Sequence, residues 1–282
     1  MQVGGPARYF AEPATEEELL EILDFARHED MPYFILGKGS NVIFPDAGYP
    51  GLVVSLLQFE KNRLEADQEN QTVTASGGTH LYRLALFCRD VGLSGVEFLS
   101  GIPGTVGGAV VMNAGFSRHT GQHNEIGDII EEVTVLNTQG KKEVRSRKVL
   151  SFGYRSSNLT GCIILEAKLR VWKRDTQAIE GEMNRNFEYR NHEQDLKHPS
   201  SGSIFKNPAA PAPSAGRLID SLGLKETQVG GIMVSPRHAN YFIKVGPAKS
   251  SDVTELIHKI QQTVFDATQV FLEPEVRIVQ LP

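Results

Sequence analysis

Two glycine-rich segments contain bare backbone that could bind an anion. They are "LGKGSN", residues 36–41, and "GIPGTVGGAV", residues 101–110. Consecutive backbone N–H groups in such turns can form a concave surface that binds phosphate without a cationic side chain. Neither segment is a familiar nucleotide motif, because the first lacks the Lys-Ser/Thr ending of a P-loop and the second lacks G-x-G-x-x-G after a strand. Glycine turns alone are usually structural, so the pattern leaves both roles open.

A serine and an arginine form a second set of candidates. Ser203 lies in "PSSGSIFKNP", where a turn rich in glycine and proline can present a hydroxyl at a fixed angle, and Arg155 follows a tyrosine in "FGYRSSNL". An arginine can bind a carboxylate through two parallel hydrogen bonds. The competing interpretations are a turn serine and a surface arginine, and the residues by themselves favour these. A Ser-His-Asp hydrolase has weak support, because the G-x-S-x-G elbow is absent.

Two acids close to the C-terminus are also candidates. Glu275 in "LEPEVR" is predicted to lie in a terminal strand, residues 271–280, with Glu273 on the same face. An acid that points inward from a strand needs a partner or has a shifted pKa. The alternative is that one of the two is simply solvated.

The histidines give little indication of a metal. His119 and His123 are four residues apart, as two ligands on a helix would be, but Gly121 lies between them and the sequence offers no third ligand. We therefore predict no metal site. His238 in "SPRHANYF" is expected to form a hydrogen bond beside a site rather than to bind a metal.

Hydrophobic periodicity predicts the elements that would position these residues. Thr15 and Glu18 have capping-box spacing at the start of an amphipathic helix, and Ser251 can cap a second helix with apolar residues at 253, 256, 257, 260 and 264. A polar connecting helix is expected over 174–194. Strands are predicted within the segments 31–44, 51–56, 72–78, 131–137, 162–172, 239–246 and 271–280. These elements suggest three domains, residues 1–59, 60–173 and 174–282.

Composition excludes several classes of protein. The 282 residues suffice for two or three domains, and 29 basic against 34 acidic residues give a net charge of −5, which argues against binding to nucleic acid. Cys88 and Cys162 lie in apolar surroundings, so we expect reduced packing residues in a cytoplasmic protein. No apolar run or signal-peptide pattern predicts contact with a membrane. A glycine turn, "VGGPA", so near the first residue leads us to expect an upstream strand.

In order along the chain, seven segments resemble one family. They are "VGGPA", "LGKGSNVIF", "GIPGTVGGAVVMNAG", "FGYRSSNL", "PSSGSIFKNP", "AGRLIDSLGLK" and "LEPEVR". The family is that of the flavin-dependent UDP-N-acetylenolpyruvoylglucosamine reductases of bacterial cell-wall synthesis, also called UDP-N-acetylmuramate dehydrogenases. The resemblance spans nearly the whole chain. It implies an α+β fold with a two-part FAD-binding α/β domain of the vanillyl-alcohol-oxidase type, followed by a smaller α+β substrate domain.

The resemblance also implies a cofactor site. Both glycine segments would lie against FAD, whose pyrophosphate needs amide donors and close approach of the backbone. The residues implied to contact FAD are Gly37, Gly39, Ser40, Asn41, Gly101, Gly104, Thr105, Gly107, Gly108 and Asn113. We expect Gly107→Val and Gly108→Val each to abolish FAD binding. A branched side chain would block close approach of the cofactor and exclude positive φ.

The implied reaction assigns roles to the remaining candidates. Ser203 would be the proton donor, and Arg155 and Glu275 would stabilise the enol or enolate form of the substrate. Tyr154, Asn207 and His238 are implied substrate contacts. NADPH would reduce the flavin, which would pass hydride to the enolpyruvyl methylene carbon while Ser203 protonates the adjacent carbon. The implied role is peptidoglycan precursor synthesis, and hence cell shape and division, by a monomer whose partners are small molecules.

Some segments depart from the family pattern, and two alternatives remain. "NAGFSRHTGQHNEIGD" replaces a more compact turn, and the short run before "HPSSGS" is similar to the family type that lacks an inserted substrate loop. One alternative is an oxidase of the same fold, although no matched segment offers the His or Cys that oxidases commonly use for covalent flavin attachment. The other is a flavin-binding protein without reductase activity, which would be expected to lack at least one of Arg155, Ser203 and Glu275.

Overall fold

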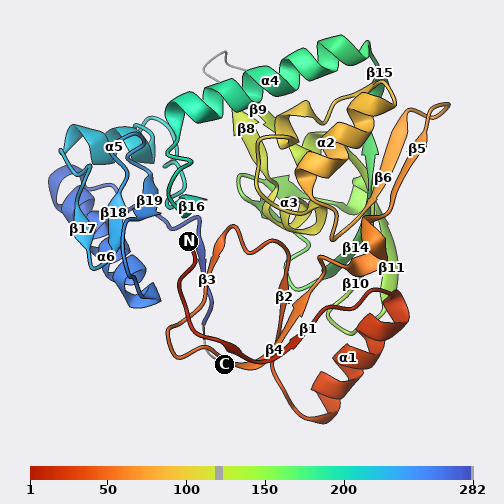
Figure 1. Cartoon of the computed structure of the whole chain (residues 1–282), viewed down its shortest axis with the longest axis horizontal. Helices are drawn as coiled ribbons and strands as arrows, with labels where there is room; N and C mark the ends of the chain where they lie inside the picture. Colours follow the sequence, from red (N-terminus) through yellow and green to blue (C-terminus); the bar gives the residue numbers. More distant parts are fainter. Residues whose placement is uncertain (118–122, 281–282) are drawn as a thin grey trace. The chain divides into compact units, whose positions relative to one another are not determined.

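The structure of the protein, a computed structural model, describes residues 1–117 and 123–280 (Figure 1). The described chain divides into two compact units. The larger unit contains residues 9–38 and 51–190, and the smaller contains residues 1–8, residues 39–50 and the chain from Asn191 onward. The smaller unit is thus built from three separate segments of the sequence. The predicted division into residues 1–59, 60–173 and 174–282 follows chain order and stays a prediction.

The first helix of the larger unit, α1 (Glu16–His28), begins where the capping pattern predicts. The Thr15 Oγ1 atom accepts a hydrogen bond from the Glu18 N–H at 3.2 Å, and Glu18 Oε2 accepts one from the Ala14 N–H at 2.7 Å. Three residues of its apolar face, at positions 19, 23 and 26, are buried. The helix packs beside a three-stranded sheet with the order β1 (Ala7–Ala11), β4 (Tyr49–Ser55) and β2 (Tyr33–Leu36).

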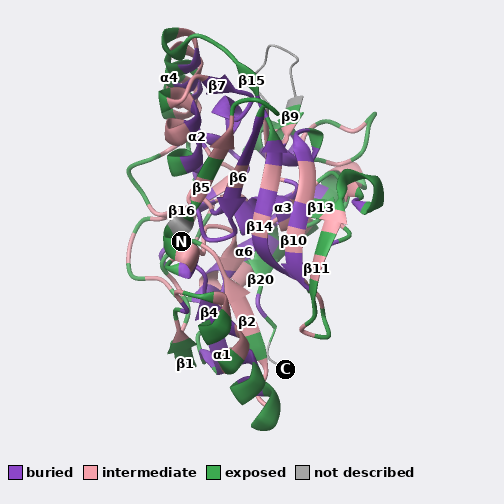
Figure 2. Cartoon of the chain, turned by 90° about the vertical axis from the view of Figure 1, so that its right-hand side faces the viewer, coloured by how far each residue is buried: buried purple, intermediate pink, exposed green. Residues whose placement is uncertain are grey.

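A five-stranded antiparallel sheet forms the centre of the larger unit. Its order is β11 (Lys142–Ser146), β10 (Ile130–Leu136), β14 (Ile163–Arg170), β6 (Thr72–Ser76) and β5 (Leu64–Asp67). The central strands β10, β14 and β6 are largely buried (Figure 2). Two helices, α2 (Leu81–Asp90) and α3 (Val106–Met112), contribute to the same apolar core. Cys88 is buried in this core as expected, whereas Cys162 is only partly buried.

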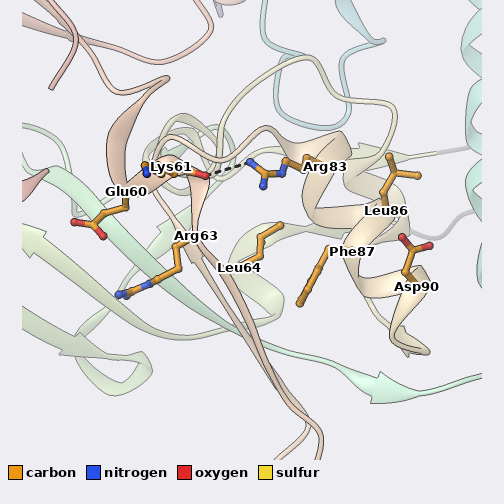
Figure 3. Close-up of a pocket in the computed structure, with 8 residues that line it drawn as sticks. All are labelled: Glu60, Lys61, Arg63, Leu64, Arg83, Leu86, Phe87 and Asp90. Atoms are coloured by element: carbon orange, nitrogen blue, oxygen red, sulfur yellow. Dashed lines mark hydrogen bonds between the residues drawn. The ribbon is translucent and has the colours of Figure 1, made fainter. Parts of the chain in front are cut away.

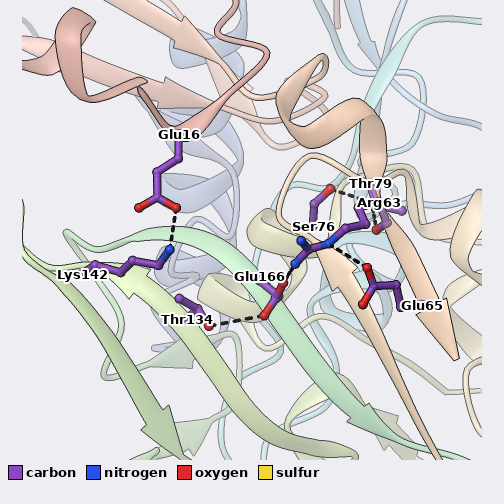
Figure 4. Close-up of polar contacts among 8 residues, drawn as sticks. All are labelled: Glu16, Arg63, Glu65, Ser76, Thr79, Thr134, Lys142 and Glu166. Carbon is purple, nitrogen blue, oxygen red and sulfur yellow. Dashed lines mark hydrogen bonds and ion pairs between the residues drawn. The ribbon is translucent and has the colours of Figure 1, made fainter. Parts of the chain in front are cut away.

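A polar contact connects α1 to the five-stranded sheet, and another joins two parts of that sheet (Figure 4). Lys142 Nζ lies 2.6 Å from Glu16 Oε2, and Arg63 forms an ion pair with Glu166. Apolar residues of α1 and β4 also share one buried cluster with residues of β10 and β14. Residues 9–38 and 51–59 therefore belong to the same compact unit as residues 60–173.

Several shorter elements complete the larger unit. The short antiparallel pairs are β7 (Leu93–Ser94) with β15 (Trp172–Lys173), β8 (Gly115–Ser117) with β9 (His123–Glu125), and β12 (Phe152–Gly153) with β13 (Ser156–Ser157). The 3-10 helices are η1 (Phe59–Asn62), η2 (Glu97–Leu99), η3 (Ile126–Asp128) and η4 (Arg147–Val149).

The connecting helix is α4 (Thr176–Glu193), and its Asn186 side chain donates a hydrogen bond to the Glu97 carbonyl at 2.9 Å.

A four-stranded sheet with two helices forms the smaller unit (Figure 1). The sheet order is β16 (Ser200–Ser203), β19 (Tyr241–Lys244), β18 (Ile232–Val234) and β17 (Gln228–Val229). Helix α6 (Ser250–Thr268) packs on β17 and β18, and α5 (Ala215–Ser221) packs on α6. A parallel pair, β3 (Val42–Ile43) with β20 (Arg277–Ile278), joins the segment 39–50 to the end of the chain.

Two predictions for the smaller unit are wrong in detail. Helix α6 begins at Ser250, with Lys249 as the N-cap residue, so Ser251 lies inside the first turn and does not cap it. The carboxylate of Asp46 accepts hydrogen bonds there from the Ser250 N–H at 2.6 Å and the Ser251 N–H at 3.0 Å. The predicted strand over 271–280 is reduced to β20 and an isolated bridge at Pro274, because its main-chain bonds are divided between Ile204–Lys206 and the segment around β3.

The described residues contain neither a helix that could span a membrane nor a cluster of metal-binding side chains. None of the helices among the described residues combines the length and apolar character that a bilayer span needs. Within residues 1–117 and 123–280, no three His, Cys, Asp or Glu side chains are grouped so that they could hold a metal ion. The candidate pair is not among these side chains, because His119 and the side chain of His123 lie outside the described residues.

Candidate active site

Ser203 and Glu275 lie on neighbouring backbone segments of the smaller unit. Ser203 ends β16, where the pairing with β19 is irregular and Gly202 has a φ of 77°, a conformation that glycine adopts without strain. The next residue, Ile204, accepts a hydrogen bond through its carbonyl from the Glu275 N–H at 2.7 Å. Phe205 and Pro274 form a bridge beside it. The fold therefore brings the backbone segments of Ser203 and Glu275 close together.

The other acid of this segment, Glu273, is engaged elsewhere. Its Oε1 atom lies 2.6 Å from Lys206 Nζ, and its side chain is 65% exposed. Of the two acids that the sequence offered, Glu273 is thus the solvated one. Glu275 precedes β20 rather than lying inside a strand, which corrects the prediction about its position.

Asn41 fixes the Glu275 segment. Its Nδ2 atom donates to the Glu275 carbonyl at 3.1 Å, and its own carbonyl accepts from the Arg277 N–H at 3.0 Å. The sequence assigns Asn41 to FAD. The structure shows this side chain in contact with the protein main chain, and a contact with FAD stays a prediction.

A buried amide that the sequence analysis did not single out holds the other side of this site. Asn240 is 4% exposed, and its side chain accepts from the Phe205 N–H at 3.0 Å and donates to the Phe205 carbonyl at 2.7 Å. Its main-chain carbonyl also accepts from the Ile204 N–H at 2.9 Å. A signal existed in the sequence, since Asn240 is a polar residue at the start of the apolar run "ANYFIKVG".

His238 and Asn207 also lie in this unit. His238 Nδ1 accepts from the Asn240 N–H at 3.2 Å, so the neutral ring carries its proton on Nε2. Burial lowers the pKa of His238 below its usual range, Glu193 opposes this shift, and Lys225 adds to it. The Asn207 Oδ1 atom accepts from the Ala215 N–H at 3.1 Å, at the start of α5. His238 forms a hydrogen bond with the chain next to Asn240, and the substrate contacts of His238 and Asn207 stay predictions.

In the larger unit, Arg155 lies at the tip of the β12–β13 hairpin. The turn consists of Tyr154 and Arg155, and Arg155 has a φ of 54°, which is uncommon for a residue other than glycine. The side chain is only 16% exposed. Its Nη2 atom donates to the Gly115 carbonyl at 3.4 Å, and its Cζ atom lies 5.0 Å from the centre of the Tyr154 ring. Arg155 is thus not the surface arginine of the competing interpretation.

Two further residues connect Arg155 to helix α3. Glu125 Oε1 lies 3.8 Å from Arg155 Nη1, and Glu125 Oε2 accepts from Asn113 Nδ2 at 2.6 Å. Asn113 caps the C-terminus of α3 with a φ of 46°; it also donates to the Gly153 carbonyl at 2.9 Å and accepts from the Gly127 N–H at 3.0 Å. The sequence assigns Asn113 to FAD, whereas its side chain bonds to the protein here. The sequence analysis missed Glu125.

The glycines of the predicted cofactor loops fall into different classes. Gly39 has a φ of 69°, while Gly37, Gly101, Gly104, Gly107 and Gly108 show no positive φ, so the expected backbone strain at Gly107 and Gly108 is wrong. A Cβ on Gly37 would lie 2.4 Å from Thr105 Oγ1, and one on Gly107 would lie 3.1 Å from the Gly77 carbonyl oxygen. These two glycines let segments of the protein pack closely.

Gly108 differs from Gly37 and Gly107, and it is the glycine that indicates room for a cofactor. A Cβ there would meet Thr105 Oγ1 at 3.6 Å, an ordinary contact, and no other neighbouring atom within 4 Å. The protein itself therefore does not require glycine at this position. A group that approaches the backbone closely would require it, and the side chain of Thr105 and the bare backbone at Gly37 lie against the same loop. The residues present fit a large anionic cofactor such as FAD.

A pocket of about 490 Å³ lies elsewhere in the larger unit (Figure 3). It is formed by η1, β5 and α2, and its lining residues are Glu60, Lys61, Arg63, Leu64, Arg83, Leu86, Phe87 and Asp90. Arg83 donates to the Lys61 carbonyl at 3.4 Å, and Arg63 is paired with Glu166. None of the predicted site residues lines this pocket, and Arg63 and Arg83 have partners within the protein.

Comparison with known proteins identifies two family domains in the chain. The sequence profile described as "FAD binding domain" matches residues 7–144, and the profile described as "UDP-N-acetylenolpyruvoylglucosamine reductase, C-terminal domain" matches residues 194–279. The first range contains the glycine segments and Asn113. The second contains Ser203, Asn207, His238, Asn240 and Glu275.

Curated proteins and a solved structure match almost the whole chain. A UDP-N-acetylenolpyruvoylglucosamine reductase of Syntrophus aciditrophicus is 38% identical over 99% of this chain and 88% of its own length, and one of Clostridium novyi is 39% identical with the same coverage. The crystal structure of the corresponding reductase from Thermus caldophilus superposes with a TM-score of 0.78 at 35% identity, covering 99% of this chain and 94% of that one. Together with the FAD binding domain, these matches confirm the predicted fold class.

Proposed function

The chain belongs to the UDP-N-acetylenolpyruvoylglucosamine reductase family and is an FAD-dependent oxidoreductase, and we propose that it reduces UDP-N-acetylglucosamine-enolpyruvate to UDP-N-acetylmuramate with NADPH as reductant. The observation that carries this proposal is the junction of Ser203 and Glu275. Their backbone segments are joined through Ile204 inside the range that the reductase C-terminal profile matches. This backbone junction supports a site in which Ser203 is the proton donor and Glu275 supplies a carboxylate.

FAD, when bound, supplies hydride transfer from NADPH to the methylene carbon of the enolpyruvyl group. The residues that would hold it are those of the two glycine segments, including Gly108, where the protein leaves room beside the backbone. Ser40 and Gly104 belong to the same proposed surface.

The protein's own residues handle the proton and the charge. Ser203 Oγ holds the proton that moves to the carbon next to the substrate carboxylate, and Ser203 recovers a proton from solvent. As the methylene carbon receives hydride, that neighbouring carbon gains carbanion character, so cationic and hydrogen-bonding groups lower the barrier. Arg155 binds the carboxylate through its guanidinium, and Glu275 stabilises the enol form. Serine is a weak acid, so its hydroxyl must be aligned beforehand, and the bonds around Ile204 and Phe205 support that alignment.

The rest of the proposed site follows from the same reaction. Tyr154, Asn207 and His238 contact the substrate, with His238 neutral and donating from Nε2. The product belongs to peptidoglycan precursor synthesis, so the protein serves cell-wall formation, cell shape and division. We propose a cytoplasmic monomer with two FAD-binding parts, residues 1–59 and 60–173, and a substrate domain, residues 174–282.

The absorption spectrum of the purified protein tests the proposal. Flavin bands are expected, NADPH should bleach them without oxygen, and the enolpyruvyl substrate should then restore them. Bands that return with oxygen but not with the substrate would indicate an oxidase. A spectrum without flavin after reconstitution with FAD would remove the proposed cofactor.

A further inference from the structure

Glu125 lies where it can control the orientation of Arg155. Three groups of the larger unit lie close to the guanidinium. They are the Glu125 carboxylate at 3.8 Å from Nη1, the Gly115 carbonyl at 3.4 Å from Nη2, and the Tyr154 ring at 5.0 Å from Cζ. Of these three groups, Glu125 is the one with a negative charge, so it attracts the Arg155 guanidinium electrostatically.

The burial of the pair makes this charge important. The Arg155 side chain is 16% exposed and that of Glu125 is 17% exposed. A guanidinium removed this far from water loses hydration, and a carboxylate near it offsets that loss while restricting the rotamers of the arginine. Removal of one member of such a pair leaves the other buried charge without compensation.

Glu125 is itself fixed by two bonds that do not involve Arg155. Its Oε2 atom accepts from Asn113 Nδ2 at 2.6 Å, and its main-chain N–H donates to Asp128 Oδ2 at 3.0 Å. Asn113 also donates to the carbonyl of Gly153, two residues before Arg155. One buried amide thus holds both the carboxylate and the hairpin that carries the arginine.

We infer that Glu125 is a positioning residue that, held by Asn113, orients the Arg155 guanidinium for the substrate carboxylate. The inference rests on the role that the proposed function gives to Arg155. Glu125 does not touch the substrate in this scheme. It acts through Arg155, so its effect should appear only in the half-reaction that uses the enolpyruvyl substrate.

Stopped-flow measurement of the two half-reactions in Glu125→Gln tests this. Glutamine keeps an oxygen for the hydrogen bond from Asn113 and removes the charge. Flavin reduction by NADPH should stay within about twofold of the wild type, and reoxidation by saturating substrate should slow by about tenfold or more, as expected for a misplaced binding group. Glu125→Asp, which keeps the charge, should recover part of the rate. Reoxidation within twofold of the wild type in Glu125→Gln would overturn the inference.

A double-mutant comparison separates positioning from a general structural effect. If Glu125 acts through Arg155, Glu125→Gln should change reoxidation less than twofold in an Arg155→Lys background. An equal slowing in both backgrounds would overturn the inference while leaving the proposed function intact. Normal reoxidation in Arg155→Lys by itself would instead reject the proposed role of Arg155, and with it the inference.

A matched control removes another carboxylate that is paired with an arginine. Glu143 Oε2 lies 2.9 Å from Arg145 Nη2 on β11, at the edge of the five-stranded sheet of the same unit. Glu143→Gln should leave both half-reactions unchanged. A slowing of reoxidation in this variant equal to that in Glu125→Gln would show that loss of any such pair disturbs the enzyme, and would overturn the specific role of Glu125.

Discussion

Two regions that carry the proposed chemistry are held in place in different ways. The serine region, residues 203–207 and 273–275, is fixed mainly by main-chain hydrogen bonds such as that from the Glu275 N–H to the Ile204 carbonyl. The arginine region, residues 153–155 with Glu125 and Asn113, is fixed mainly by side chains. Main-chain bonds persist when side chains change, whereas a side-chain network can lose its geometry through one substitution. The arginine region should therefore be the more sensitive to changes in the residues around it.

The largest expected effect comes from the functional group of the serine region. Ser203→Ala should leave FAD binding and reduction by NADPH nearly unchanged and should slow reoxidation by the enolpyruvyl substrate. Loss of a general acid commonly lowers a rate by about two to four orders of magnitude, or about 3–5 kcal/mol of barrier. Ser203→Cys should recover part of the rate. Normal reoxidation in the alanine variant, measured by stopped-flow, would leave Ser203 as a turn residue.

The next effect concerns the one buried side chain that we identify as a support of the serine region. Asn240→Ala should lower the free energy of unfolding by about 2–4 kcal/mol, because the N–H and carbonyl of Phe205 would both lose their partner while buried. Urea denaturation measures this. Asn70→Ala, which removes a surface hydrogen bond to Asp67, is the control and should change stability by less than about 0.5 kcal/mol. Equal stability of the two variants would show that main-chain bonds alone hold the serine region.

A pair of glycines in α3, the helix that Asn113 caps, separates packing from cofactor approach. Gly107→Ala should destabilise the protein without FAD by about 1–3 kcal/mol, because its Cβ would meet the Gly77 carbonyl oxygen and Ile164. Gly108→Ala should leave that stability unchanged or slightly higher and should weaken retention of FAD, as should the larger Gly108→Val. Full flavin content in Gly108→Val after gel filtration would disprove the placement of this loop.

The smallest effect concerns Asp46, whose side chain accepts hydrogen bonds from the start of α6 in the unit that contains the serine region. Loss of some hydration raises its pKa, but hydrogen bonds from Ser250 and Ser251 outweigh this and lower the pKa to about 2. Asp46→Ala should lower the free energy of unfolding at neutral pH by about 1 kcal/mol at most. Loss of a helix cap typically costs about that much, and the exposure of this side chain to solvent reduces the effect.

The pH dependence of this variant follows from the direction of the shift. A depressed pKa in the folded state gives stability that is fully present above the ordinary aspartate pKa and is lost as the pH falls towards 2. The difference between wild type and Asp46→Ala should therefore shrink between about pH 4 and pH 2 in urea titrations. Asp24→Ala, which breaks an exposed pair with Arg27, should show less than about 0.5 kcal/mol at any pH. A difference that stays constant down to pH 2 would contradict the role of the carboxylate charge.

Local patterns predicted most of the elements correctly. Helix α1 begins with the bond between Thr15 and Glu18 that capping-box spacing indicates, and the strands around residues 72–76, 130–136 and 163–170 occur where apolar runs predict them. The errors lie at element ends. Ser251 fails as a cap because Asp46, far away in the sequence, supplies the acceptor, and Glu275 is not in a strand because only two residues there find a parallel partner.

The sequence by itself determined the order of the motifs, and through them the family, the fold class and the identities of Ser203, Arg155 and Glu275 as candidates. These signals are local: a capping residue, an apolar period or a short motif can be read from neighbouring residues. The tertiary structure decided what holds those candidates. Asn240 reaches Phe205 across 35 positions, Asn41 reaches Glu275 across 234, and Glu125 meets Arg155 from another hairpin. A periodic pattern carries no record of such partners, because their proximity arises only when strands pair and the chain is packed.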